Sequence, residues 1–95
     1  MCGIAGYFNK NSNFENINLT IDKMNDLQLH RGPNSTGKFV NFEKNFSLKM
    51  CRLSILDLEL GIQPMHSLDD RYVIIFNGTI LNSPELRKKL ESLNV

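Results

Sequence analysis

One uninterrupted apolar run, Tyr72–Phe76, constrains the fold of this chain more than any other segment. A strand without a polar face is typical of the interior of a sheet, where both faces are buried. The run stops at Asn77-Gly78, a dipeptide that favours a tight turn. We therefore expect a central strand that ends at Asn77, with further strands on both of its edges.

Three other segments have the composition of strands. They are Gly3–Phe8, Gly37–Phe42 and Phe46–Ile55, and the polar turn Glu43-Lys44-Asn45 makes a hairpin of the last two. The two-residue period of a strand places Phe46, Leu48 and Met50 on one face, and Ser47, Lys49 and Cys51 on the other. The segment Gly61–Asp70 predicts a loop.

Two helices complete the pattern. The first should stop at Gly32-Pro33. Its apolar residues at helical spacing are Ile17, Ile21, Met24 and Leu27, and its candidate caps are Asn16, Asn18 and Thr20. The second helix has Ser83 as its expected N-cap, Pro84 in its first turn, and a buried stripe of Leu86, Leu90 and Leu93.

The composition is that of a soluble globular domain. Hydrophobic residues make up 41% of the chain and charged residues 22%, and the net charge is +1. Nothing in this balance predicts a nucleic-acid or membrane surface. The start of the chain lacks the pattern of a secretory signal, so we expect a cytoplasmic protein with free thiols at Cys2 and Cys51. Neither cysteine has metal-ligand spacing, and we expect no metal site.

The second residue supplies the main functional hypothesis. Removal of Met1 would leave Cys2 with its thiol and its own α-amine on one residue. The pKa of an α-amine is about 7.7–8.0, so at neutral pH part of it is an unprotonated base beside the nucleophile. By position alone, a small buried cysteine is the commoner explanation. The hypothesis therefore depends on the residues farther along.

Three further segments could complete a catalytic site. His30 is a candidate base, although a helix stop explains His30–Pro33 more simply. Arg52 has the planar donor fork that binds a carboxylate, or it forms an ordinary ion pair with Asp57. Asn77 and Gly78 could form an oxyanion hole, or a plain turn. Together with the thiol, these parts indicate acyl transfer from an amino-acid amide, most naturally glutamine.

The same motifs occur in this order in class II glutamine amidotransferases. Besides Met1–Gly6 they are His30–Pro33, Arg52–Ile55, Gln63-Pro64-Met65 and Asn77-Gly78, and the chain most resembles the glutaminase domain of asparagine synthetases. The resemblance implies an α+β fold, the N-terminal part of an α/β/β/α Ntn-hydrolase sandwich with mainly antiparallel sheets. It also implies that residues 1–95 are a partial type-2 glutamine amidotransferase domain, which should continue beyond Val95.

The resemblance assigns roles to the candidate residues. Cys2 is the nucleophile that forms a γ-glutamyl thioester, and Asn77 and Gly78 form the oxyanion hole. The glutamine pocket comprises Arg52, Leu53, Ser54, Ile55, Leu56, Asn77, Gly78 and Thr79. Thr79 stands where the family commonly has an acidic residue for the substrate ammonium, and a second acidic partner would lie beyond Val95.

The expected cofactors and partners follow from the same resemblance. Glutamine is the substrate and this chain needs no cofactor, whereas ATP, Mg and aspartate belong to an absent C-terminal synthetase domain. Neither nucleic acid nor a membrane is an expected partner, and the full-length protein could form a homodimer. Two alternatives stay open: a truncated fragment without catalysis of its own, and an amidotransferase of another branch with a different acceptor.

Overall fold

The computed structural model describes residues 2–11, 14–53 and 61–95. Its elements in chain order are β1 (Gly3–Phe8), α1 (Phe14–Asp26), the 3-10 helix η1 (Leu29–Arg31), β2 (Ser35–Asn41), β3 (Phe46–Arg52), β4 (Met65–His66), β5 (Val73–Ile74) and α2 (Ser83–Ser92). One sheet has the strand order β1-β3-β2 and the other pairs β4 with β5, and all of these pairings are antiparallel. The prediction of mixed helices and antiparallel sheets is confirmed at this level.

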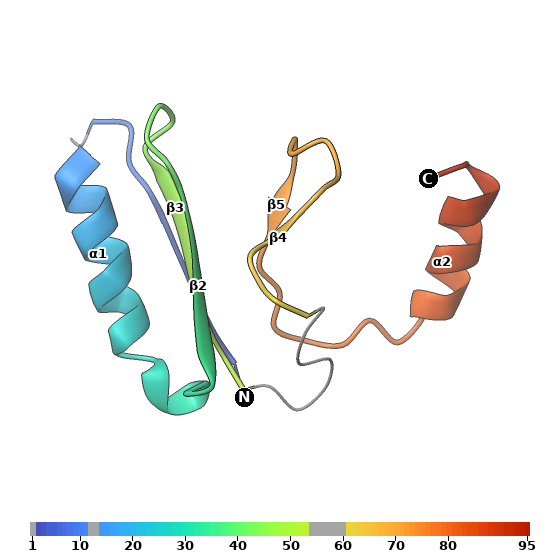
Figure 1. The fold of residues 1–95 in the computed structure, drawn as a ribbon, viewed down its shortest axis with the longest axis horizontal. Coiled ribbons are helices and arrows are strands. Elements are labelled where there is room, and N and C mark those ends of the chain that lie inside the picture. Colours follow the sequence, from blue (N-terminus) through green and yellow to red (C-terminus); the bar gives the residue numbers. More distant parts are fainter. Residues whose placement is uncertain (1, 12–13, 54–60) are drawn as a thin grey trace.

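The elements lie in successive layers (Figure 1). Helix α1 packs along one face of the three-stranded sheet, and the β4–β5 hairpin lies on the other side. The ring of His66 meets the ring of Phe39 edge-on, with 5.6 Å between ring centroids, so the hairpin contacts the sheet directly. Within the described residues, no helix has the length and apolar character of a membrane span.

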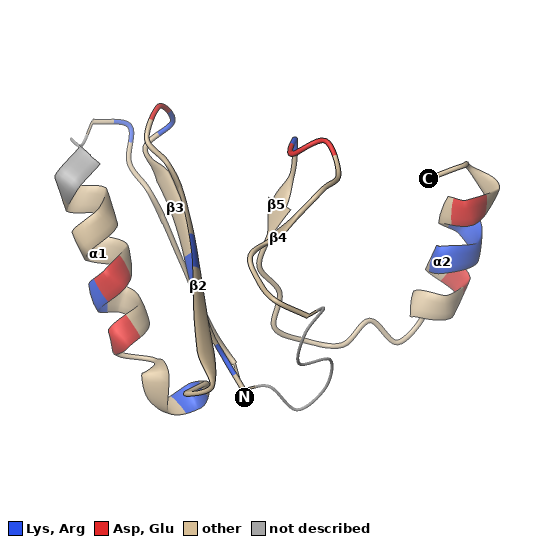
Figure 2. Cartoon of the chain, in the orientation of Figure 1, with Lys and Arg blue, Asp and Glu red and all other residues tan. Residues whose placement is uncertain are grey.

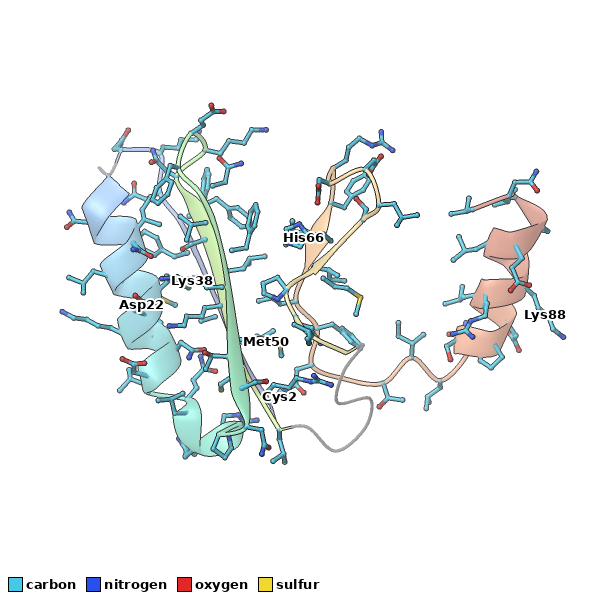
Figure 3. All side chains as sticks on the ribbon, viewed as in Figure 1. Cys2, Asp22, Lys38, Met50, His66 and Lys88 are labelled. Carbon is cyan, nitrogen blue, oxygen red and sulfur yellow. The ribbon has the colours of Figure 1, made fainter. Side chains whose placement is uncertain are left out.

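The two-residue period predicted for β3 is confirmed by its contacts. On the α1 side, the Lys49 ammonium lies 2.8 Å from Asp22, and the Cys51 thiol donates to the Gln28 carbonyl at 3.1 Å. Met50 lies on the opposite side, toward the hairpin, and is only 1% exposed (Figure 3). The sheet therefore has one face for α1 and a second face for the hairpin.

The core between α1 and the sheet is small. Ile17 and Ile21 are fully buried, as their spacing predicts, and Asn25 is buried one turn later. Leu27 was predicted in the same stripe but is 80% exposed, because α1 ends at Asp26 and Leu27 lies in the turn between α1 and η1. The prediction of a cap was also wrong. Helix α1 begins at Phe14, in the polar segment, so the candidates Asn16, Asn18 and Thr20 lie inside it.

The strand predictions after residue 52 were partly wrong. The structure ends β3 at Arg52, and the expected extension to Ile55 enters residues that it does not describe. The predicted central strand is reduced to β5, whose ladder partner is β4, in the segment predicted as a loop. Ile74 is 55% exposed, because too little of the described chain covers the face of β5 that carries it.

Helix α2 forms where its punctuation predicts, but it is not packed. The N-cap is Asn82, one residue before the predicted Ser83. A run of basic residues lies between two acidic residues along the helix, and all of them are exposed (Figure 2). The predicted buried stripe was wrong, because α2 stands apart from both sheets and every residue from 76 to 95 is exposed (Figure 1). The leucines concerned, Leu86, Leu90 and Leu93, are 42%, 48% and 62% exposed.

Candidate active site

Cys2 lies directly before β1, at the end of the sheet where β3 finishes. The pairing of Gly3 with Cys51 sets this register. The Leu53 N–H donates to the Cys2 sulfur at 3.4 Å, and the thiol is directed at the Leu53 carbonyl at 3.9 Å. Cys2 is half-buried. The candidate nucleophile is thus held by the main chain just after β3 without being enclosed.

The carbonyl oxygen of Cys2 is fixed by two side chains. Arg31 Nε donates to it at 3.2 Å from η1, and Asn77 Nδ2 donates to it at 3.0 Å from the segment after β5. With Leu53 on the sulfur, three segments that are distant in the sequence meet at one residue. A residue at the end of a strand has few main-chain neighbours, so these side-chain donors determine its orientation.

Arg31 is a site residue that the sequence argument missed. The sequence predicts His30 as the candidate base of this segment, and His30 is exposed in η1. A Cβ on Gly32 would lie 2.6 Å from main-chain atoms of Cys51 and Arg52, so the turn rests directly on the end of β3. This close approach brings Arg31 to Cys2. The available signal was an arginine directly before a Gly-Pro stop, close to an expected strand end.

Arg52 is the last residue of β3 and is 8% exposed. By the alternation of the strand it projects on the same side as Met50, which is the side where Figure 3 places Cys2. Its role as a carboxylate clamp stays a prediction. The other pocket residues of this segment, Ser54, Ile55 and Leu56, lie outside the described residues, as does Asp57.

Asn77, Gly78 and Thr79 follow β5 and are all exposed. The Asn77 amide reaches Cys2, as required of an oxyanion donor that serves this thiol. Gly78 lies against the ring of Phe76, whose Cζ is 3.0 Å from the position of a Cβ at residue 78. The structure therefore brings together Cys2, Leu53 and Asn77, while the roles of Gly78 and Thr79 stay predictions.

The charged groups around α1 lie on the other side of the sheet from this site. Asp22 accepts hydrogen bonds from Lys49 at 2.8 Å and from Lys38 at 3.1 Å, and Figure 3 shows Asp22 and Lys38 between α1 and the sheet. The hydrogen bond from Lys49 is the main reason why the pKa of Asp22 is below its usual range. The described residues contain no group of three potential metal ligands.

Comparison with known proteins identifies the family of this site. A profile of the glutamine amidotransferase domain matches residues 1–95. The chain belongs to this family. The prediction made from the motifs is therefore confirmed over the full sequence given.

Three relatives illustrate the extent of the similarity. Asparagine synthetase [glutamine-hydrolyzing] 1 of Bacillus subtilis is 44% identical over 94 residues, which cover 97% of this chain and 15% of that protein. A putative asparagine synthetase 2 of Methanocaldococcus jannaschii is 40% identical over 106 residues, covering 94% and 20%. Asparagine synthetase B of Escherichia coli is 32% identical over 87 residues, covering 92% and 15%. The glutamine amidotransferase chain thus spans about a fifth or less of these relatives, and no solved structure matches it.

Proposed function

We propose that this chain is the glutaminase part of an asparagine-synthetase-like amidotransferase. One observation supports the proposal above all. Cys2 is held at its sulfur by the Leu53 N–H and at its carbonyl by Arg31 and Asn77, which places a polar donor beside the nucleophile. Relatives named as glutamine-hydrolysing make glutamine the natural amide substrate.

The proposed reaction uses the α-amine of Cys2 as its base. This group is in a peptide bond to Met1 in the given sequence, so Met1 must be removed first. The amine takes the thiol proton, and the thiolate attacks the side-chain amide carbon of glutamine. The Asn77 amide and the Gly78 N–H donate to the resulting oxyanion. The ammonium returns its proton to the departing nitrogen, ammonia leaves, and water hydrolyses the γ-glutamyl thioester to glutamate.

The other parts of the proposal concern substrate binding and the rest of the protein. Arg52 binds the α-carboxylate of glutamine. Helix α1 and the three-stranded sheet form half of an Ntn-hydrolase sandwich. The ammonia serves an ATP- and Mg-dependent amidation of aspartate in a synthetase domain, within a cytoplasmic, homodimeric protein. Relatives several times longer than this chain support such a domain.

The nucleophile is tested in a longer protein. Residues 1–95 replace the matching segment of the Bacillus subtilis relative, and intact mass spectrometry first checks that Met1 is lost. Cys2→Ala should abolish ammonia release from glutamine and leave asparagine synthesis from free ammonia intact. A variant that still hydrolyses glutamine would refute the assignment of Cys2.

The carboxylate clamp is tested in the same protein. Arg52→Ala should raise KM for glutamine with little change in kcat, since a clamp binds the ground and transition states alike. An unchanged KM would instead favour an ordinary structural ion pair. Cys2→Ala serves as the blank for background ammonia release.

One observation favours the alternative that residues 1–95 alone are inactive. Asn77, Gly78 and Thr79 are exposed, and Thr79 offers no charge to the substrate ammonium. A lost hydrogen bond to a charged group costs about 1.5–3 kcal/mol, so glutamine should bind the isolated chain poorly. Labelling with 6-diazo-5-oxonorleucine checks this expectation. Rapid modification of Cys2 that glutamine prevents would show that the isolated chain is competent.

A further inference from the structure

The side chain of Gln63 is bonded at both ends to one main-chain unit. Its Nε2 donates to the Phe76 carbonyl at 3.0 Å, and its Oε1 accepts from the Phe76 N–H at 2.6 Å. A primary amide has donors on one side and an acceptor on the other, and can therefore replace a neighbouring strand for a single residue. Gln63 does so just past the end of β5, where the ladder with β4 has stopped.

The residue after Phe76 is Asn77, whose amide reaches the Cys2 carbonyl. We propose that Gln63 is a positioning residue that holds Asn77 in place against Cys2. The proposal rests on the function proposed above, because it assigns Asn77 a task in glutamine hydrolysis. Gln63 itself does not touch the reacting atoms, and it acts through the main chain of Phe76.

The main chain of Gln63 is anchored to the sheet that carries Cys2. A Cβ on Gly37 would lie 1.7 Å from the Gln63 carbonyl oxygen, so Gln63 rests directly on β2. Gly37 pairs with Met50, and Met50 pairs with Ile4, two residues from Cys2. The main chain of Gln63 thus contacts the nucleophile's sheet, while its side chain holds the segment of the oxyanion donor.

Among the residues that the structure describes, few other contacts fix the segment of Asn77. Strand β5 comprises only Val73 and Ile74, and all residues from 76 onward are exposed. A hydrogen bond contributes a net ~0.5–1.5 kcal/mol, so two bonds on one residue matter in such a short strand.

A comparable bond at the other end of the hairpin provides a control. Ser67 Oγ accepts from the Tyr72 N–H at 3.0 Å, near the turn and away from Cys2. Ser67→Ala therefore weakens the same hairpin without touching Phe76. If the stability of the hairpin alone held Asn77, both substitutions would loosen Asn77. If Gln63 positions Asn77, only the substitution of Gln63 would do so.

The test measures solvent exchange of the Asn77 side-chain amide by NMR in the ¹⁵N-labelled 95-residue chain. Gln63→Met keeps the length of the side chain and removes both bonds. Exchange should rise about tenfold, as expected from the loss of roughly 1.4 kcal/mol, and should change less than about twofold in Ser67→Ala. Equal exchange in Gln63→Met and the unaltered chain, or an equal rise in both variants, would overturn the proposal. If Gln63→Met does not fold, Gln63→Glu replaces it, because the carboxylate keeps the acceptor but cannot donate to Phe76.

The catalytic consequence is measured in the longer protein described above. Because Asn77 donates to the oxyanion in the transition state, Gln63→Met should lower kcat about tenfold or more with KM nearly unchanged. A higher KM at constant kcat would overturn the positioning role. If the unaltered protein hydrolyses no glutamine, the proposed function fails, while the exchange experiment still decides whether Gln63 holds Asn77.

Discussion

The contact between Gly37 and Gln63 makes a sharp prediction for Gly37→Ala. The added Cβ would lie 1.7 Å from the Gln63 carbonyl oxygen, and real Cβ atoms are essentially never closer than 3.0 Å to such a neighbour. The loop must therefore retreat by about 1.3 Å, which is more than the two hydrogen bonds between Gln63 and Phe76 tolerate. Overpacking of this kind costs about 1–3 kcal/mol, so we expect destabilisation by about 2 kcal/mol.

Gly6→Ala is the matched control on the same face of the sheet. A Cβ there would meet Leu48 at 3.4 Å, an ordinary contact, and Ala in a strand is favoured over Gly by about 0.5–1 kcal/mol. Urea unfolding followed by circular dichroism measures both variants, and amide exchange of Phe76 reports on the loop. If Gly37→Ala were as stable as Gly6→Ala and kept Phe76 protected, the Gln63 main chain would not rest on β2, and Gln63 could not hold Asn77 against the sheet.

Four further substitutions test the packing of α1 and of the turn that follows it. Asp22→Asn should cost about 0.5–1 kcal/mol at neutral pH, because the carboxylate is partly exposed. Folding lowers the pKa of Asp22 below 3.8, so this stabilisation is present above pH 3.8 and is lost as the pH falls through the folded-state pKa. The urea midpoints of Asp22→Asn and of the unaltered chain should therefore converge at about pH 2, and midpoints that stay apart there would contradict this. Asn25→Leu should stabilise the chain by about 1–2 kcal/mol, because no described residue bonds its buried amide, and a loss in thermal unfolding would refute that reading. Ile21→Ala should cost about 2–4 kcal/mol in urea, whereas the exposed Leu27→Ala should change stability by less than about 0.5 kcal/mol, and equal losses would contradict the assigned core.

Local patterns predicted the elements of the three-stranded sheet and the buried face of α1. Strand β1 has the predicted bounds, and the β2–β3 hairpin has the predicted faces. Ile17 and Ile21 are buried because α1 packs on β1 and β3. The same reasoning was wrong for Ile74 and Leu90. An apolar residue becomes buried only if another element covers it, and the two-residue or four-residue period carries no information about that element.

The site shows a similar division. Cys2 and Asn77 were predicted because each has a chemical signature of its own, a thiol beside an amine and an amide after a strand. Arg31 and Gln63 act through main-chain partners far along the chain, the Cys2 carbonyl and the Phe76 peptide. The chemistry of these two side chains does not predict which main-chain groups they bond. Their positions depend on close contacts at Gly32 and Gly37. In the sequence alone, these residues are typical of an ordinary turn glycine and an ordinary strand glycine.

The two donors on the Cys2 carbonyl leave the Asn77 amide able to act on the substrate. Asn77 Nδ2 carries two N–H groups, and its bond to the Cys2 carbonyl at 3.0 Å uses one of them. The second N–H of the same nitrogen is the donor that the proposed oxyanion would receive, so the amide need not leave Cys2 during the reaction. Arg31 Nε bonds the same carbonyl from η1 and helps to keep the nucleophile in place. Gln63 bonds the main chain of Phe76 and fixes the residue directly before Asn77. Holding Cys2 on one side and the main chain before Asn77 on the other therefore keeps the donor and the nucleophile together, as the proposed chemistry requires.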